Sequence, residues 1–144
     1  MKKRMLSWGL MLSLLFTLLP VRVLAAGGTC NGSHSGWTAL TAGTASLSGN
    51  CYLSDHVTAS SSITISGTAT LCLNGKVLDL NGYSITVGSG GSLTICDCQT
   101  TATGGCLDEN GLWQQSSGGE SCTLDGGVIT GGKATLGGAI LVEG

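Results

Sequence analysis

Two short stretches of the chain, Ser62–Ile65 (Ser-Ile-Thr-Ile) and Ser84–Val87 (Ser-Ile-Thr-Val), decide the expected fold. In each stretch, apolar residues alternate with hydroxyl-bearing residues, which is the pattern of a β-strand with one buried face. The two stretches start 22 residues apart, and each is followed by a second strand-like segment, Leu71–Leu73 or Leu93–Cys96. A repeat of this length, made of short β-branched strands, predicts a β-solenoid whose coils each hold about three strands.

Two Asn-Gly pairs, at residues 74–75 and 81–82, flank a weaker strand candidate at Val77–Leu80. Both residue types tolerate positive φ, so the pairs predict turns between strands. An Asn-Gly turn also closes tight antiparallel hairpins. The sequence therefore predicts an all-β fold, a parallel β-helix of few coils, with an antiparallel β-sandwich or meander as the alternative.

Residues 1–25 have the three parts of a secretory signal peptide. Lys2–Arg4 is a positive n-region, Met5–Leu19 is an apolar run, and Val23–Ala25 supplies a small-residue cleavage site. A membrane-spanning helix needs about 20 apolar residues, and Arg22 ends this run too early for one. We therefore expect an exported protein, secreted or at the cell surface, with no membrane contact after the signal is cleaved.

Removing that segment changes the charge of the chain. The sequence contains six Lys and Arg against eight Asp and Glu, and four of the six basic residues lie in residues 1–25, so the mature chain has a net charge of −6. A nucleic-acid binder would need a basic face, so this class is excluded. The mature chain contains four aromatic side chains and is nearly half Gly, Ser and Thr. This composition predicts a thin core lined by Ile, Leu, Val, Ala, Cys and Thr.

The repeat pattern is interrupted at residues 99–121, which are rich in Gly, Ser and Gln and contain no strand-like alternation. We expect this segment to be a loop inserted into the coils, which occupy residues 51–144 after an N-terminal cap segment at residues 26–50. Strand-like sequence resumes at Cys122–Ile129, and a last strand is expected at Ala139–Val142. Natural solenoids end in a polar cap. The apolar end therefore predicts a fragment of a longer repeat protein, or self-association through the last coil.

Four motifs occur in order along the chain: His34–Leu40 (HSGWTAL), Tyr52–Thr58 (YLSDHVT), Leu71–Gly75 (LCLNG) and Leu93–Cys98 (LTICDC). With these motifs the chain resembles the start of the large predicted cell-surface β-helix proteins of gut-type Gram-positive anaerobes. In that family, sequence similar to Gly126–Gly132 opens a long array of Gly-rich coils. The resemblance implies a right-handed parallel β-helix and a non-enzymatic, structural or adhesin-like role in the cell envelope.

All seven cysteines lie in the exported part of the chain, and an oxidising compartment favours disulfides. Cys106 and Cys122 flank most of the inserted segment, and a disulfide between them would contribute on the order of 3 kcal/mol. Cys51, Cys72 and Cys96 recur about once per coil. We expect these three to stack as small buried side chains, with a disulfide between neighbouring coils as the alternative.

Zinc is the other interpretation of the cysteines. The residues on which such a site would depend are Cys30 with His34, Cys51 with His56, and the pair at Cys96–Cys98. The usual Cys-x2–4-Cys and His-x3–5-His spacing of zinc sites is absent. We therefore predict no metal site and no cofactor.

Two other ligand-binding motifs are incomplete. Gly127–Lys133 has the spacing of a phosphate-binding P-loop, but Ala134 replaces the Ser or Thr that holds Mg²⁺. Asp108–Gly111 resembles part of an EF-hand loop, but Cys106 and Ser117 stand where two essential carboxylates are required. We interpret both segments as turns.

Polysaccharide lyases and hydrolases are the enzyme classes to weigh, because many right-handed β-helices cleave pectin-like polymers. Such lyases typically use an arginine base, and the chain has no arginine after residue 25. Hydrolysis requires two carboxylates about 5–9.5 Å apart, and Asp79 and Asp97 are the candidates. Asp79 alternates outward from Leu78 and Leu80, and Asp97 lies between two cysteines. We expect no catalytic residue in this segment; the alternative is a remnant of such an enzyme.

A carbohydrate-binding module is the remaining hypothesis. A β-helix displays flat faces of Ser and Thr hydroxyls, beside which Tyr83 or Trp113 could stack on a sugar ring. Trp37 belongs to the first of the four motifs, and we expect it to pack over the first coil as a cap. The expected partners are therefore an extracellular glycan or a host or cell-wall surface.

Overall fold

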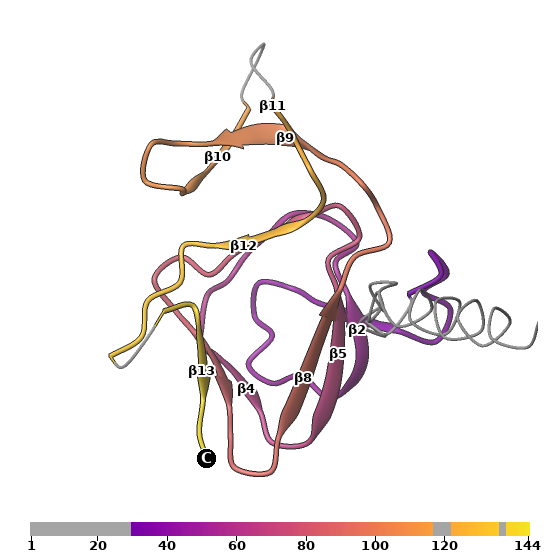
Figure 1. Cartoon of the computed structure of the whole chain (residues 1–144), viewed down its shortest axis with the longest axis vertical. Coiled ribbons are helices and arrows are strands. Elements are labelled where there is room, and N and C mark those ends of the chain that lie inside the picture. Colours follow the sequence, from indigo (N-terminus) through magenta and orange to yellow (C-terminus); the bar gives the residue numbers. More distant parts are fainter. Residues whose placement is uncertain (1–29, 117–121, 136–137) are drawn as a thin grey trace, which may run out of the picture.

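The computed structural model describes residues 30–116, 122–135 and 138–144. The predicted signal peptide at residues 1–25 lies outside these ranges. Every regular element in the described ranges is a β-strand, and no helix in them is long and apolar enough to cross a membrane. The all-β prediction is confirmed (Figure 1).

The strands form three small parallel sheets and one antiparallel sheet. Sheet 1 contains β1 (Thr38–Ala39), β2 (Gly49–Tyr52), β5 (Thr68–Cys72) and β8 (Ser92–Cys96). Sheet 2 contains β3 (Val57–Thr58), β6 (Val77–Asp79) and β12 (Val128–Thr130). Sheet 3 contains β4 (Ile63–Ile65), β7 (Ile85–Val87) and β13 (Ile140–Val142). Sheet 4 is antiparallel and contains β9 (Ala102–Leu107), β10 (Trp113–Gln115) and β11 (Cys122–Leu124).

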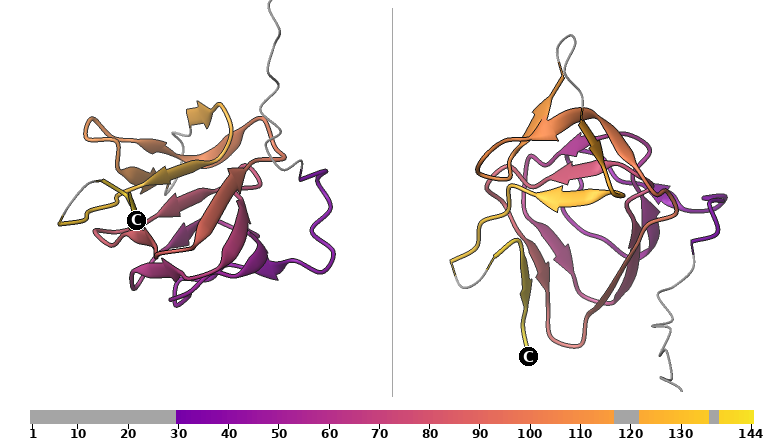
Figure 2. Two further views of the ribbon diagram at one scale, coloured as in Figure 1. Left: turned by 60° about the horizontal axis from the view of Figure 1, so that its bottom comes forward. Right: turned by 45° about the horizontal axis from the view of Figure 1, so that its top comes forward.

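The chain passes through the three parallel sheets in a constant order. From β2 in sheet 1 it runs to β3 in sheet 2 and β4 in sheet 3, and it repeats this circuit through β5, β6 and β7 before returning to sheet 1 at β8. After sheet 4 it resumes with β12 in sheet 2 and β13 in sheet 3 (Figure 2). Strands of successive circuits pair in register, and Ile63 lies opposite Ile85. The predicted 22-residue offset is therefore confirmed.

The two Asn-Gly turns connect different sheets. Asn74 and Gly75 join β5 to β6, Asn81 and Gly82 join β6 to β7, and all four residues have positive φ. Because the connected strands belong to different parallel sheets, the hairpin alternative is wrong at both turns. Gly75 is required for a second reason, since a Cβ there would lie 2.5 Å from the carbonyl oxygen of Thr101.

The core is narrow and aliphatic. Inward-facing residues of the three parallel sheets pack into one cluster, and no aromatic side chain of the described ranges belongs to it. The largest fully buried residues in this cluster are Leu53, Ile63, Ile65, Leu71, Leu78, Leu80 and Ile85. The structure thus confirms the thin core expected from the scarcity of aromatic residues.

Sheet 4 corrects the prediction that residues 99–121 contain no strand. Both β9 and β10 lie in this segment and pair antiparallel, and β11 completes the sheet on the other side of β9. The alternation of apolar and polar side chains that marks a strand is absent here because β9 contains two glycines in its middle. A Cβ at Gly105 would overlap the ring of Trp113 and the carbonyl group of Gln114, so close pairing with β10 requires glycine here. Sheet 4 lies at one end of the molecule, beside β12 (Figures 1 and 2).

The predicted disulfide between Cys106 and Cys122 is present, with Cα atoms 5.0 Å apart. It joins β9 to β11, and Cys122 lies opposite Gly105 in the ladder. The two cysteines are 16 residues apart in sequence. The bond therefore closes the part of the chain that contains β10 and holds sheet 4 together.

Replacing Ile85 by Ala should destabilise the protein far more than a change on the outer face of the same sheet. Ile85 is 0% exposed and lies between Ile63 and Ile140 in the middle strand of sheet 3, and such a truncation costs about 2–5 kcal/mol. The matched control is Thr64→Ala, at an exposed position of β4. Urea denaturation measures both variants, and equal losses of unfolding free energy would contradict the assignment of the buried face.

The double variant Cys106→Ser, Cys122→Ser should lower the free energy of unfolding by about 3 kcal/mol, the amount expected when a loop of roughly 15 residues is no longer closed. Urea denaturation of the variant and of the wild-type chain measures the difference. Peptide mapping of the wild-type chain without reduction checks that the bond is formed. Identical denaturation midpoints would show that the bond does not stabilise sheet 4.

Candidate functional site

The register of sheet 1 separates the cysteines into two groups. Cys51 pairs with Leu71 and lies with it in the core, whereas Cys72 pairs with Tyr52 and Cys96. Because successive side chains of a strand point to opposite faces, Cys72 and Cys96 lie on the outer face of sheet 1. Cys51 is therefore buried as predicted but does not stack with the other two cysteines. Cys72 and Cys96 stack as predicted, with Cys72 buried and Cys96 partly buried.

The segment before β1 and the turn after β8 bring further donor atoms to Cys72. The Sγ atoms of Cys30 and Cys98 lie 3.2 Å and 3.6 Å from that of Cys72. The Nε2 of His34 lies 3.8 Å from the Sγ of Cys98. Cys72 is fully buried, and the other donors are partly buried. We call Cys30, His34, Cys72, Cys96 and Cys98 the Cys/His cluster.

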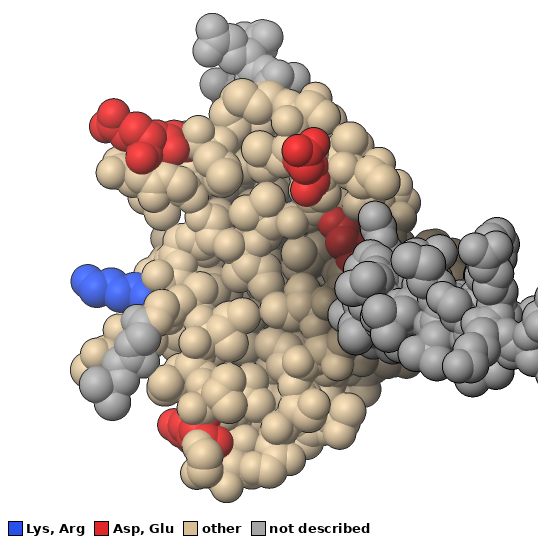
Figure 3. All heavy atoms as spheres, viewed as in Figure 1, with Lys and Arg blue, Asp and Glu red and all other residues tan. Residues whose placement is uncertain are grey.

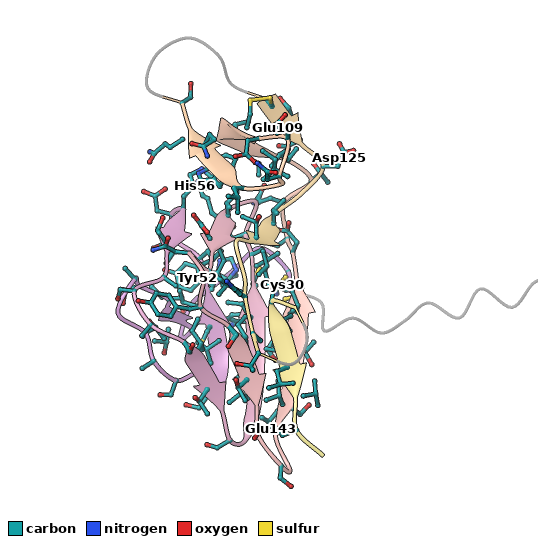
Figure 4. All side chains as sticks on the ribbon, turned by 90° about the vertical axis from the view of Figure 1, so that its left-hand side faces the viewer. Cys30, Tyr52, His56, Glu109, Asp125 and Glu143 are labelled. Atoms are coloured by element: carbon teal, nitrogen blue, oxygen red, sulfur yellow. A yellow bond between two sulfur atoms is a disulfide. The ribbon has the colours of Figure 1, made fainter. Side chains whose placement is uncertain are left out.

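The Cys/His cluster contains two overlapping groups of metal-binding side chains. The donor atoms of Cys30, Cys72 and Cys96 all lie within 4.8 Å of one another, and so do those of His34, Cys72 and Cys98. Cys72 belongs to both groups and is the centre of the cluster. Figure 4 shows the labelled Cys30 and Tyr52 in the body of the molecule, away from Glu109 and Asp125 at the sheet 4 end.

Two aromatic side chains hold the imidazole of His34 in place. The ring of Tyr52 stacks on it with centroids 4.4 Å apart and planes 6° apart, and the ring of Trp37 meets its edge at 5.3 Å. The backbone N–H of Trp37 also donates a hydrogen bond to the carbonyl of His34. Trp37, which we expected to cap the first coil, therefore packs against a member of the Cys/His cluster.

Asn74 orients the thiol of Cys98. The Sγ of Cys98 donates to the Oδ1 of Asn74 at 3.3 Å, while the Nδ2 of Asn74 donates to the carbonyl of Leu53 at 3.0 Å. The Asn-Gly turn after β5 thus faces the Cys/His cluster, and the motif that the sequence marks as a turn also supports Cys98.

Asp97 fixes the turn that follows β8. Its Oδ1 accepts hydrogen bonds from the backbone N–H of Gly75 at 2.8 Å and of Gln99 at 3.1 Å. Its Oδ2 accepts the backbone N–H of Gly127, which lies just before β12. A Cβ at Gly127 would overlap Leu73, so glycine lets this backbone approach. Asp97 is thus a structural carboxylate that joins three turns and sets the position of Cys98 next to it.

Burial raises the pKa of all five free thiols, namely those of Cys30, Cys51, Cys72, Cys96 and Cys98. For Cys30 the pKa rises to about 11. Catalytic cysteines have a lowered pKa instead, because the thiolate is the nucleophile. These thiols are therefore protonated at neutral pH in the absence of a metal and are poor nucleophiles.

His56 does not join the Cys/His cluster. Its Nδ1 accepts the backbone N–H of Val77 at 3.0 Å, and its Nε2 lies 2.8 Å from the carbonyl oxygen of Thr103. The ring also packs on Trp113, with centroids 4.9 Å apart. His56 therefore links sheet 2 to sheet 4. The sequence paired Cys51 with His56, but neither residue belongs to a metal-binding group among the described residues.

A groove of about 690 Å³ lies between sheet 4 and the turn after β12. Asn110 and Trp113 line it from the sheet 4 side, and Asp79, Thr130 and Lys133 line it from the sheet 2 side. Of the two aromatic residues expected to stack on sugars, Trp113 lines this groove. Tyr83 is 38% exposed and is not among the lining residues.

The two candidate catalytic carboxylates occupy different sites. Asp79 lines the groove, and its Oδ1 accepts the backbone N–H of Asn81 at 2.8 Å. Asp97 does not line the groove and holds the turns described above. Asp79 and Asp97 therefore do not form the pair of carboxylates facing a common substrate that hydrolysis of a glycosidic bond requires.

The incomplete nucleotide and calcium motifs form turns. In the P-loop-like segment, Gly131 has a φ of +66° and lies against the carboxylate of Asp79. In the EF-hand-like segment, the Oδ1 of Asp108 accepts the backbone N–H groups of Asn110 and Leu112, each at 2.9 Å. These hydrogen bonds, chiefly that of Leu112, lower the pKa of the Asp108 carboxyl. Asp108 therefore stabilises its own turn.

Replacing Asp97 by Ala should lower the free energy of unfolding by about 1–3 kcal/mol, because it leaves backbone N–H groups of three turns without their acceptor. The matched control is Asp125→Ala, which removes an exposed carboxylate in the turn before β12. Urea denaturation measures both variants. A loss no greater than that of the control would contradict the role of Asp97 as the link between these turns.

No protein-family model, curated protein or solved structure matches this chain.

Proposed function

We propose that the chain is an exported β-helix protein with a structural or adhesin-like, non-enzymatic role at the cell surface. The observation that carries this proposal is the constant order in which the chain visits three parallel sheets, with successive strands in register. We interpret each circuit as one coil of a parallel β-helix. The resemblance of the four sequence motifs to surface proteins of gut-type anaerobes supports a right-handed helix and a place in the cell envelope.

Two features support a location outside the cytoplasm. Residues 1–25 have the pattern of a secretory signal. Cys106 and Cys122 form a disulfide, and disulfides persist in oxidising compartments such as the cell exterior.

Three features support a role without catalysis in this segment. The carboxylates of Asp79 and Asp97 accept backbone hydrogen bonds at separate sites. Burial raises the pKa of the free thiols, which disfavours nucleophilic chemistry. On the face shown in Figure 3, charged side chains are few. A surface of this kind suits contact with a polymer better than acid–base chemistry.

Carbohydrate binding in the groove is the second candidate function. Sugar sites combine an aromatic side chain with a few placed polar groups, and Trp113 lines the groove together with Asn110, Asp79 and Lys133. An amide, a carboxylate and an ammonium group supply both donors and acceptors for hydroxyl groups. An adhesin-like protein that holds a glycan would use this groove.

A binding screen with residues 26–144 tests both proposals. We expect the chain to be retained on host or cell-wall polysaccharides without any increase in reducing ends. If the groove is the site, Lys133→Ala should weaken retention about tenfold, as the loss of a charged hydrogen bond does. Tyr83→Ala is the control, because Tyr83 is exposed outside the groove.

The outcomes separate the hypotheses. Equal retention of the Lys133 and Tyr83 variants would place binding outside the groove. Failure to bind any polymer would contradict both the adhesin-like role and the carbohydrate-binding role. New reducing ends would contradict the absence of catalysis.

A further inference from the structure

The Cys/His cluster joins donor atoms from three separate parts of the chain. Cys30 and His34 precede β1, Cys72 ends β5, Cys96 ends β8, and Cys98 lies in the turn that follows β8. The separations from His34 to Cys98 and from Cys30 to Cys72 are 64 and 42 residues. Tertiary structure alone brings these groups together around one buried sulfur.

We propose that Cys30, His34, Cys72 and Cys98 bind one Zn²⁺ ion on the outer face of sheet 1. Three thiolates and one imidazole are a common ligand set of structural zinc sites. This site departs from the sequence prediction of no metal, and it does not depend on the proposed function.

The observed distances approach those of a tetrahedral zinc site. Zn–S bonds of about 2.3 Å place two thiolate sulfurs about 3.8 Å apart at the corners of a tetrahedron. The Cys72 sulfur lies 3.2 Å from that of Cys30 and 3.6 Å from that of Cys98, and the Cys98 sulfur lies 3.8 Å from the His34 nitrogen. These three contacts are near ligand spacing. Cys30 is not in the group of donors within 4.8 Å that contains His34 and Cys98, so binding requires Cys30 to move closer to them.

The groups around the donors resemble the supporting shell of a metal site. Metal-binding side chains are held in orientation by neighbouring hydrogen bonds and packing. Tyr52 and Trp37 fix the plane of the His34 imidazole, and Asn74 contacts the sulfur of Cys98. Soft thiolates with imidazole select zinc over oxygen-preferring cations such as Mg²⁺ and Ca²⁺.

A set of disulfides explains the cluster less well than a metal does. The imidazole of His34 has no part in a disulfide, yet it lies against the Cys98 sulfur. Cys30, Cys72, Cys96 and Cys98 are all free, although Cys106 and Cys122 are bonded in the same structure. Zinc would also protect these thiols from oxidation outside the cell. Binding releases the three thiol protons to solvent, because thiolates are the ligands.

Cys96 is the neighbouring thiol that the proposal leaves out. Its sulfur lies within 4.8 Å of those of Cys30 and Cys72, and neither Cys30 nor Cys96 is in the group that contains His34. We assign Cys30 as the ligand because its sulfur lies 3.2 Å from that of Cys72. Bound zinc would fasten the segment before β1 to the ends of β5 and β8. It would therefore close the outer face of sheet 1 in the way that a cap does.

Metal analysis of residues 26–144, purified with a reductant and without chelator, tests the proposal. We expect one Zn²⁺ per chain, and Co²⁺ in its place should give the intense visible absorption of a tetrahedral thiolate complex. Removing the metal with EDTA should lower Tm. The wild-type chain alone can contradict the site, since a fully reduced protein that binds neither Zn²⁺ nor Co²⁺ would overturn it.

Matched variants test the ligands. Cys98→Ser and His34→Gln should weaken Co²⁺ binding more than about 100-fold, since even changes outside the ligand set cost about 10- to 100-fold. Their Tm should no longer respond to EDTA. Cys51→Ala and His56→Gln are the controls, because both residues lie outside the Cys/His cluster, and they should retain one ion per chain.

Three results would overturn the assignment. The first is full Co²⁺ binding by His34→Gln. The second is loss of metal in Cys96→Ser with retention in Cys30→Ser, which would show that Cys96 and not Cys30 is a ligand. The third is a chain that stays metal-free after reduction and forms disulfides among Cys30, Cys72, Cys96 and Cys98 on oxidation, as peptide mapping would show.

Discussion

The parallel pairing of β2, β5 and β8 in sheet 1 is the constraint on which the rest of the structure depends. Parallel pairing places residues of successive circuits side by side, and strand geometry then sends alternate side chains to opposite faces. Leu71 and Cys51 consequently face the core, while Cys72 and Cys96 face outward. A shift of one residue would bury the outer thiols in the core and expose the leucine. The same pairing therefore sets both the hydrophobic core and the position of the Cys/His cluster.

Asp97 connects this sheet to the rest of the molecule. Its carboxylate accepts backbone hydrogen bonds from the turn after β5, the turn after β8 and the turn before β12. The segment of sheet 4 leaves and rejoins the parallel sheets between the last two of these turns. One side chain thus allows a separate antiparallel sheet to be inserted without disturbing the order of circuits. The insertion in turn creates the groove beside Trp113.

Local patterns explain which features were predictable. Ser62–Ile65 and Ser84–Val87 show their buried faces by alternation alone, and their spacing equals the register in sheet 3. The cysteine spacing was misleading because Cys51 and Cys72 are 21 residues apart, whereas pairing in sheet 1 places Cys51 opposite Leu71. Sheet 4 was missed because the glycines of β9 carry no side-chain pattern. Strand β9 is held in place by its pairing with β10 and β11 and by the disulfide to Cys122.

The sequence by itself determined the strands of the repeat, the apolar faces, the Asn-Gly turns and the disulfide of the insertion, because each depends on residues close in sequence or on simple counting. Only the tertiary structure decided which thiols meet. The Cys/His cluster depends on the path of the segment before β1. It also depends on the number of residues in each circuit, because one residue more or less would turn a cysteine to the other face of sheet 1. The groove likewise depends on how sheet 4 lies against the turn after β12. Both sites are made by pairing between distant segments, and no local pattern encodes that pairing.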